Sequence, residues 1–464
     1  MTHVHLIGIG GSGLSAIAQV LLESGYAVSG SDRAISPLAE NLVRLGARVE
    51  IGHAASHITG ADIVVRSSAI PDSNPEVQAA LAQGIPVLKR SEFLGQLLTG
   101  RIGIAIAGTH GKTTTTAMIA WMLTALGQDP SFIVGGVLKN GKTNAHAGKG
   151  EAFVIEADEY DRMFLGLAPK IMVITNVEHD HPDCYPTLAE YEGVFAEFTT
   201  RLQPGGTIIG CIEDGGAAAT LHQAELNGQQ ILTYALGQSA DFQARKLERN
   251  AMGGFSFTLF RRWSPGNTAP VAQVNLRVPG EHNVLNCLAA LATADRLGLP
   301  LADAIHALEI FQGTGRRFEI RGEVAGVTVI DDYAHHPSEI RATLAAAHSS
   351  YPGRRIWAVW QPHTYSRTRA LFMEFATAFR TASQVIVTEV FAAREPVEAF
   401  SAADLIGPMD HPSARFIPTL PQVVDFLADA LRQEDVLLVL SAGDADQIST
   451  QVLERLAKQG LPHA

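Results

Sequence analysis

Residues 102–118 read Ile102-Gly-Ile-Ala-Ile-Ala-Gly-Thr-His-Gly-Lys-Thr-Thr-Thr-Thr-Ala-Met118. They form a short apolar run, a glycine-containing loop and a segment with helical periodicity. A strand, a tight loop and a helix N-terminus in this order form an anion site, because the loop N–H groups and the helix dipole face one point. Lys112 adds a positive charge, and the Thr113 hydroxyl can bind a Mg²⁺ that bridges two phosphates. The residues expected to face a nucleotide's phosphates are Gly108, Thr109, His110, Gly111, Lys112, Thr113 and Thr114.

This loop departs from the strict P-loop pattern. That pattern has a glycine six residues before the lysine, and this chain has Ile106 there. A chance glycine-lysine turn would also give part of the motif. The order of strand, loop, Lys-Thr and helix favours a shortened phosphate loop.

The composition limits the class of protein. A chain of 464 residues is too long for one hydrophobic core, so two to four domains are expected. The net charge of −12 argues against non-specific nucleic-acid binding. Three scattered cysteines without a CxxC pair favour the cytoplasm and disfavour a structural zinc site. No basic leader and no apolar run of about 18 residues is found, so no membrane association is expected. The expected oligomeric state is a monomer or homodimer.

The first residues contain a second glycine motif. Gly8, Gly10 and Gly13 satisfy G-x-G-x-x-G between a predicted strand and a predicted helix, and Asp32 lies about where a ribose-binding acid belongs. Three interpretations stay open: an NAD site, glycines that only allow close packing, or a loop for the pyrophosphate of a UDP-sugar. The residues expected to contact such a ligand are Gly10, Gly11, Ser12, Gly13, Ser31, Asp32, Ser67 and Ser68.

Strands and helices alternate through the rest of the first hundred residues. Apolar runs at 62–66 and 85–88 read as strands, and 75–83 and 91–98 have helical periodicity. Such alternation predicts a parallel α/β sheet. Thr99-Gly100-Arg101 precedes the strand at Ile102, and a domain boundary is placed there.

Acidic residues and histidines follow two buried-type strands of the middle segment. Strand 153–155 leads into Glu156, the carboxylate chosen as a Mg²⁺ ligand, whereas Glu159 and Asp161 fit a solvated acidic turn. Strand 171–175 leads into a run with two histidines and three acids, and an imidazole can complete a second metal site that shares a carboxylate. Strand C-termini face the ligand crevice in α/β sheets, so both runs are expected at one site.

The middle segment ends with a different pattern. Runs 241–249, 254–260 and 271–278 read as antiparallel strands, with 261–269 as the turn between the last two. An alanine-rich helix through 296 then begins near His282, Asn283 and Asn286. An asparagine can read an adenine edge, although N-capping by Asn283 is an alternative.

The last third again alternates strands and helices. Strands are expected at 327–330, 355–360, 385–388 and 436–440, and polar motifs follow them. The fold class is therefore α/β with three domains: an N-terminal Rossmann-like domain, a central P-loop ATPase-type domain and a C-terminal Rossmann-like domain. The central sheet is expected to be mostly parallel with an added antiparallel portion.

Eight motifs in order resemble the Mur ligases over the whole chain: Gly8–Gly13, Gly108–Thr114, Glu156–Asp161, Asn176–Asp183, His282–Asn286, Gly313–Phe318, Asp331–Pro337 and Gln361–Thr368. The resemblance implies a UDP-sugar domain (1–101), an ATP-binding domain (102–315) and a mobile domain that closes over amino acid and nucleotide (316–464). It favours the UDP interpretation of the first glycine loop over NAD.

The resemblance also implies residue roles. Lys112 and Thr113 would bind the ATP phosphates and Mg²⁺, and the metal ligands would be Thr113, Glu156 and His181. The nucleotide would be bound by His282, Asn283, Asn286, Arg317 and Asp332. The muramoyl carboxylate and the amino acid would be bound by Tyr333, His335 and Arg367. Some relatives have an arginine where this chain has Thr364, so carboxylate binding rests more on Arg367.

The activity implied by the resemblance is ATP-dependent ligation of L-alanine to UDP-N-acetylmuramate through an acyl phosphate. Lys112, Asp332, His335 and Arg367 would carry it, with His335 titrating near neutrality to accept the amine proton. Relatives that act later in the pathway use a carbamoylated lysine, and no lysine lies between Pro182 and Thr200. A murein-tripeptide recycling ligase is the nearest alternative; an NAD-dependent oxidoreductase and a non-catalytic nucleotide switch are alternatives of other classes.

Overall fold

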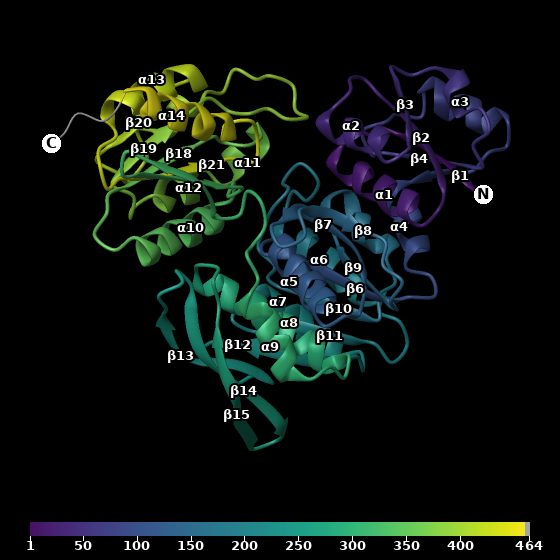
Figure 1. Ribbon diagram of the computed structural model, residues 1–464, viewed down its shortest axis with the longest axis horizontal. Helices are drawn as coiled ribbons and strands as arrows, with labels where there is room; N and C mark the ends of the chain where they lie inside the picture. Colours follow the sequence, from purple (N-terminus) through teal and green to yellow (C-terminus); the bar gives the residue numbers. More distant parts are fainter. Residues whose placement is uncertain (460–464) are drawn as a thin grey trace.

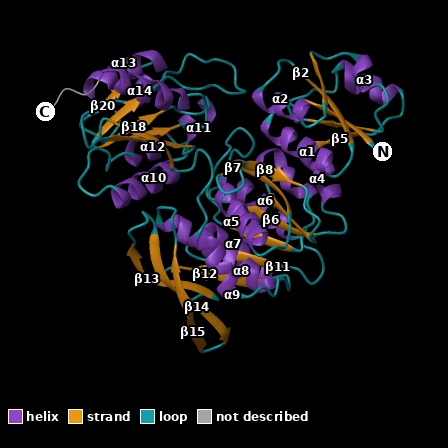
Figure 2. Ribbon diagram, in the orientation of Figure 1, coloured by secondary structure: helices purple, strands orange, loops and turns teal. Residues whose placement is uncertain are grey.

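The computed structural model describes residues 1–459 and forms three sheets, each in its own lobe (Figures 1 and 2). The N-terminal and C-terminal lobes both lie above the central lobe in Figure 1, and the β13–β15 strands extend away from them. The α/β fold with three sheets confirms the predicted fold class. The predicted third domain runs to residue 464, and its residues 460–464 lie outside the described part.

The first sheet is parallel, with strand order β3-β2-β1-β4-β5. Its elements are β1 His3–Ile7, α1 Ser12–Glu23, β2 Ala27–Asp32, α2 Pro37–Arg44, β3 Arg48–Ile51, η1 Ala55–Ile58, β4 Ile63–Arg66, α3 Pro75–Ala82, β5 Val87–Lys89 and α4 Arg90–Leu97. The sequence patterns missed α2 and β3, because both are short and half-exposed.

The central sheet has ten strands in the order β15-β14-β13-β12-β11-β10-β6-β9-β7-β8. Its elements are β6 Ile102–Ala107, α5 Lys112–Ala125, β7 Ser131–Leu138, β8 Thr143–His146, β9 Ala152–Glu156, η2 Tyr160–Gly166, β10 Ile171–Ile174, α6 Leu188–Thr199, β11 Thr207–Cys211, α7 Gly215–Leu226, β12 Gln230–Ala235, β13 Phe242–Arg249, β14 Phe255–Ser264, β15 Asn267–Asn275, α8 Glu281–Arg296 and α9 Leu301–Glu309.

The antiparallel portion is present as predicted, with β13, β14 and β15 paired antiparallel. The predicted turn at 261–269 was wrong: β14 continues to Ser264 and β15 begins at Asn267, so that Arg261 pairs with Ala269. Polar side chains on the solvent face of an edge hairpin gave this segment the composition of a loop. The β7–β8 hairpin was also missed.

The strand that precedes the phosphate loop is buried on both faces. Ile104 and Ile106 of β6 pack into one core with α5 and α8, and Ala105 and Ala107 pack into the core on the opposite face with α6. Alternate residues of a strand point to opposite faces, so a continuous apolar run fits a parallel strand between two helix layers. The loop at the end of β6 is therefore held by rigid packing.

The third sheet has the order β16-β17-β21-β18-β19-β20, with β16 antiparallel and the other strands parallel. Its elements are β16 Glu319–Val324, β17 Val327–Asp332, α10 Pro337–Ser350, β18 Ile356–Trp360, α11 Tyr365–Ala370, α12 Phe372–Ala378, β19 Gln384–Val387, η3 Ala402–Leu405, β20 Ala414–Phe416, α13 Leu420–Ala430, β21 Val436–Leu440 and α14 Asp446–Gln459. Among residues 1–459, no helix is long and apolar enough to cross a lipid bilayer.

Candidate active site

The phosphate loop between β6 and α5 needs both of its glycines. Gly108 and Gly111 have φ of 134° and 80°, and a Cβ on Gly108 would lie 2.0 Å from the Thr175 hydroxyl. The loop is fixed from the neighbouring strand end, because Asn176 accepts from the backbone N–H of Thr109 (3.0 Å) and His110 (2.7 Å). The first turn of α5, which starts at Lys112, therefore opens beside this loop as an anion site.

Lys112 folds back over its own loop. Its Nζ atom donates to the carbonyl oxygens of Gly108 (2.5 Å) and Thr109 (3.1 Å) and lies 2.9–3.0 Å from the Glu159 carboxylate. Glu159 is 1% exposed, so its prediction as a solvated turn residue was wrong; Asp161 is exposed as predicted. Burial alone would raise the pKa of Glu159, but the charges and hydrogen bonds of Lys112 and His181 together outweigh it and lower the pKa to about 2. No sequence signal separated the two acids.

Thr113 and Glu156 come together as predicted. The Thr113 hydroxyl donates to Glu156 Oε2 at 3.3 Å, and the backbone N–H of Gly135 donates to Glu156 Oε1 at 2.5 Å. Burial raises the pKa of Glu156, which means that the site favours a cation beside it. A hydroxyl and a carboxylate are the oxygen donors that Mg²⁺ prefers, so this pair fits the ion.

His181, the third residue expected at the metal, lies beside the Glu159 carboxylate. Its Nε2 atom is 3.6 Å from Glu159 and 3.8 Å from Asp180, so the structure links His181 to the phosphate loop through Glu159. It adopts φ of 53° in the polar loop after β10. Asp180 was not singled out by the sequence.

Arg367 reaches this loop from the C-terminal lobe. Its Nε atom donates to Asp180 Oδ1 at 2.7 Å, and both side chains are at most 4% exposed. Burial would raise the pKa of Asp180, but the Arg367 guanidinium holds it well below the usual range. The two Nη groups of Arg367 lie 3.1 Å from His363 and 3.4 Å from His181. Thr364, which begins the same helix, is buried.

His335 follows β17 and points its Nδ1 atom at the Tyr333 carbonyl oxygen, 2.9 Å away. Burial lowers the pKa of His335 to about 4. The expectation that His335 titrates near neutrality was therefore wrong: its imidazole is neutral at pH 7. When Nδ1 donates to the carbonyl, Nε2 keeps a free lone pair.

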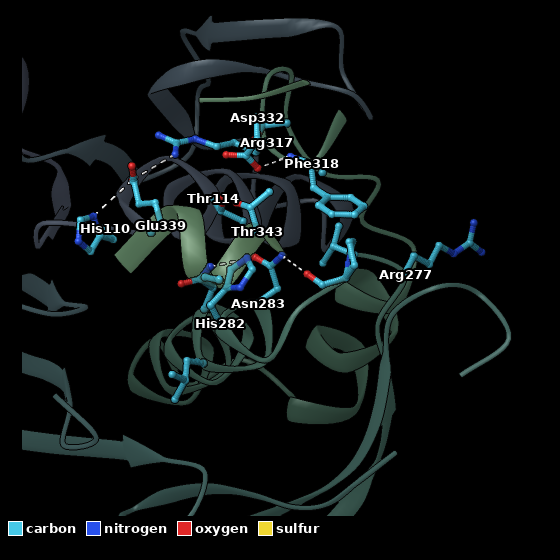
Figure 3. Close-up of a pocket in the computed structure, with 18 of the residues that line it drawn as sticks. His110, Thr114, Arg277, His282, Asn283, Arg317, Phe318, Asp332, Glu339 and Thr343 are labelled. Carbon is cyan, nitrogen blue, oxygen red and sulfur yellow. Dashed lines mark hydrogen bonds and ion pairs between the residues drawn. The ribbon is translucent and has the colours of Figure 1, made fainter. Parts of the chain in front are cut away.

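Residues of the interdomain linker and the third sheet surround the phosphate loop (Figure 3). Glu339 of α10 lies 3.3 Å from His110 and 3.5 Å from Arg317, which itself lies over the Tyr333 ring. Asp332 accepts from the backbone N–H of Phe318 at 2.8 Å, and burial raises its pKa to about 6. Glu339 joins loop and linker, yet no motif pointed to it.

A cavity of about 620 Å³ lies beside this cluster (Figure 3). Predicted site residues that line it are His110, Gly111, Thr114, His282, Asn283, Asn286, Arg317 and Asp332. Asn286 accepts from Thr115 at 3.0 Å and donates to Asn283 at 3.0 Å, while Asn283 donates to the Pro279 carbonyl at 2.6 Å. The N-cap of α8 is Gly280, so the N-capping alternative for Asn283 was wrong. The cavity is large enough for a drug-sized ligand.

The first glycine loop lies at the carboxyl end of β1. Its Gly10 N–H donates to Asp32 Oδ2 at 2.8 Å, so this acid fixes the loop from within. Ser31 is fully buried and donates to Glu76 at 2.6 Å, so its side chain supports the sheet instead of facing the crevice. Ser67 packs next to the loop, with its Cβ 3.3 Å from a Cβ built on Gly8, and Ser68 is exposed.

A second cavity, of about 150 Å³, lies between the first glycine loop and the Glu156 carboxylate. It is lined by Ser12 and Gly13 on one side and by Glu156 and Asp158 on the other. Arg90, which the sequence did not single out, crosses it and lies 3.4 Å from Asp158. A ligand held at Gly13 thus has a path to Glu156.

Comparison with known proteins gives matches along the whole chain. Residues 3–101 match "Mur ligase family, catalytic domain", residues 106–294 match "Mur ligase middle domain", and residues 316–443 match "Mur ligase, glutamate ligase domain". The chain is 43% identical over 459 residues to the UDP-N-acetylmuramate–L-alanine ligase of Acidithiobacillus ferrooxidans, covering 97% of this chain and 96% of the relative.

Two solved structures are similar over the full length. The UDP-N-acetylmuramate–alanine ligase of Thermotoga maritima superposes with a TM-score of 0.81 at 28% identity, covering 99% of this chain and all of the other. A murein peptide ligase of Psychrobacter arcticus gives 0.71 at 27% identity, with both chains fully covered.

Proposed function

The chain belongs to the Mur ligase family, and we propose that it joins L-alanine to UDP-N-acetylmuramate with cleavage of ATP to ADP and phosphate. The supporting observation is the meeting of three sites: the phosphate loop, the partly buried Glu156 carboxylate beside it, and Arg367 and His335 of the C-terminal lobe. The phosphate loop serves ATP as the phosphoryl donor, Glu156 serves the reacting carboxylate through the metal ion, and the residues of the C-terminal lobe serve the amine. The proposed domain boundaries are 1–101, 102–315 and 316–464.

The UDP-sugar is placed at the first glycine loop. The N–H groups of Gly11, Ser12 and Gly13 precede or begin α1, where a pyrophosphate is stabilised by the helix dipole. The smaller cavity then leads from Gly13 to Glu156, which supports delivery of the muramoyl carboxylate to the phosphate loop. An NAD site would leave this path and the second loop without a role.

Activation of the carboxylate is the first chemical step. A muramoyl carboxylate oxygen attacks the γ-phosphorus, the bond from that phosphorus to the ADP oxygen breaks, and an acyl phosphate and ADP result. Lys112 stabilises charge on the transferring oxygens, for which its ammonium must turn from Glu159 toward the phosphates. Thr113 and Glu156 would hold Mg²⁺, with His181 proposed to complete the metal site, and the ion would supply charge neutralisation on the phosphates.

Amide formation is the second step. The amine of L-alanine attacks the acyl carbon, and the tetrahedral intermediate collapses with loss of phosphate. His335 Nε2 is proposed to accept the amine proton, since its imidazole is neutral at pH 7. Arg367 keeps Nη donors beyond those used by Asp180, and these can bind a carboxylate of the substrates.

The C-terminal lobe excludes water from the acyl phosphate. Two ion pairs, Asp180–Arg367 and His110–Glu339, join it to the central lobe. Water would otherwise hydrolyse the activated intermediate. Binding of the adenine by Asn283 and Asn286, and of the nucleotide by His282, Arg317 and Asp332, is proposed in the larger cavity that these residues line.

A coupled assay tests the function. ADP release is measured with UDP-N-acetylmuramate, ATP and Mg²⁺, and L-alanine, glycine, L-serine or the murein tripeptide as the amine. We expect release that depends on both acid and amine, with the highest kcat/KM for L-alanine. A preference for the tripeptide would instead support the recycling activity of the murein peptide ligases, and sustained ADP release over many turnovers without an amine would contradict both.

The remaining assignments are proposals too. The cytoplasm is the proposed compartment, in agreement with Cys184, Cys211 and Cys287 all being free thiols. The oligomeric state is proposed to be a monomer or homodimer, which light scattering of the full chain decides.

A further inference from the structure

Two histidines and one glutamate meet at the interface between the central and C-terminal lobes. Within residues 1–459, His110, Glu178 and His336 each place one possible ligand atom within 4.8 Å of the others. His110 belongs to the phosphate loop, Glu178 follows β10, and His336 is the N-cap of α10. None of them is among the proposed Mg²⁺ ligands.

One ring nitrogen of each histidine faces Glu178, and a metal ion there would replace its present contact: His110 Nε2 is hydrogen-bonded to Glu178, and His336 Nδ1 accepts from the backbone N–H of Ser338 at 3.3 Å. His110 Nδ1 lies 3.3 Å from the Glu339 carboxylate, and His336 Nε2 lies 3.4 Å from the His179 carbonyl oxygen. If both of these nitrogens carry the proton, His110 Nε2 and His336 Nδ1 both face Glu178 Oε2, at 3.2 Å and 3.7 Å. Metal-binding histidines characteristically donate their second N–H to a carboxylate or a carbonyl in this way.

The distances suit a small divalent ion. Ligands at about 2.0–2.2 Å in a tetrahedral arrangement lie roughly 3.3 Å from one another. The distance between His110 and Glu178 already has this value, whereas His336 must move closer to both, since it lies 3.7 Å from Glu178 and the three ligand atoms lie within 4.8 Å of one another. The Ser338 hydroxyl, which donates to Glu178 at 2.6 Å, would have to turn away.

The charges around the site favour a cation. Burial alone would lower the pKa of His110, but its hydrogen bonds to Glu178 and Glu339 raise it to about 9. This means that the two carboxylates stabilise one positive charge on the His110 ring, which a metal ion could supply in place of the proton. Burial lowers the pKa of His336 to about 4, so the ring is neutral at pH 7 and its Nδ1 lone pair, which now accepts from the Ser338 N–H, could bind a metal ion instead.

We propose that His110, Glu178 and His336 form a binding site for one divalent transition-metal ion, with Zn²⁺ as the probe, in addition to the Mg²⁺ site. Nitrogen-rich ligand sets select such ions over Mg²⁺. Because the ligands come from both lobes, a bound ion holds α10 against the phosphate loop. A fourth position opens to the larger cavity, which His110 and Glu178 also line.

Metal binding to the full chain, without a histidine tag and without nucleotide, tests the proposal. Zn²⁺ affinity is measured by competition with a chromophoric chelator near pH 7. We expect His336→Gln and Glu178→Gln each to abolish the binding of one Zn²⁺ per chain or to weaken its affinity by at least about 100-fold. Glu339→Gln should weaken the Zn²⁺ affinity roughly 10- to 100-fold. His181→Gln, which alters the proposed Mg²⁺ site, is the matched control and should bind as the wild type does.

Co²⁺ gives a second readout that does not depend on activity. We expect the strong visible absorption of a four- or five-coordinate ion in the wild type and its loss in His336→Gln, with unchanged circular dichroism in both. Unchanged Zn²⁺ binding in the folded His336→Gln and Glu178→Gln variants would overturn the proposal, as would a wild type that binds no Zn²⁺. These results are independent of the ligase assay, so either conclusion can fail alone.

Discussion

Replacement of Glu159 by glutamine tests whether the Lys112–Glu159 pair supports the central lobe. Glu159 is 1% exposed and its carboxylate lies 2.9–3.0 Å from the Lys112 ammonium, so the change leaves a buried charge without its counter-charge. Breaking a buried pair in this way costs about 3–5 kcal/mol. Lys112 keeps two carbonyl acceptors, which places the expected loss at the lower end, about 3 kcal/mol.

The shift in the Glu159 pKa gives a second route to this magnitude. A fall from 4.5 to about 2 corresponds to about 3 kcal/mol in favour of the folded state. Because the folded pKa is depressed, this stability is fully present above pH 4.5 and is lost as the pH falls toward 2. The difference between wild type and Glu159→Gln should therefore be constant from neutral pH to about pH 5 and shrink below it.

The assay is thermal and urea unfolding followed by circular dichroism and tryptophan fluorescence. A loss of about 3 kcal/mol in a domain of this size lowers the Tm by roughly 6–12 °C. Asp161→Asn is the matched control: Asp161 is exposed with φ of 53°, a conformation that asparagine tolerates, so its effect should stay within about 0.5 kcal/mol. A loss below about 1 kcal/mol in Glu159→Gln, or an equal loss in the control, would refute the reasoning.

Three further perturbations have defined outcomes. Lys112→Ala should abolish ADP formation while UDP-sugar binding, measured by calorimetry, persists; retained turnover would contradict the proposed ATP site. Arg367→Ala should lower kcat/KM for L-alanine roughly 10- to 100-fold by removing charged hydrogen bonds, with little change in ATP binding, whereas the half-exposed Arg369→Ala on the same helix should leave it unchanged. Glu76→Gln should destabilise the N-terminal lobe by about 3 kcal/mol near neutral pH. Burial opposes the charge of Glu76, but its hydrogen bonds to His5 and Ser31 lower its pKa from 4.5 to about 2. In urea unfolding, the stability difference between wild type and variant should therefore vanish as the pH falls through this range.

The alternation of strands and helices was predictable because each of these elements has a local pattern of apolar and polar residues that indicates it. The run Ile102–Ala107 is apolar throughout, and the structure buries it on both faces. The elements that were missed, such as β3 and β8, are four-residue edge strands whose side chains are half-exposed. Four residues are too few to show a clear alternation of apolar and polar side chains, so the positions of these strands follow from the neighbouring strand and not from their own residues.

The sequence by itself determined the phosphate loop, the Thr113–Glu156 pair and the order of the sheets. These depend on spacing along the chain and on the rule that parallel strands end at one edge. Only the tertiary structure decided which acid each cation meets: Glu159 meets Lys112, and Asp180 meets Arg367. The physical reason is that burial and charge pairing across an interface set the state of each group, and residues far apart in sequence carry no local signal of it.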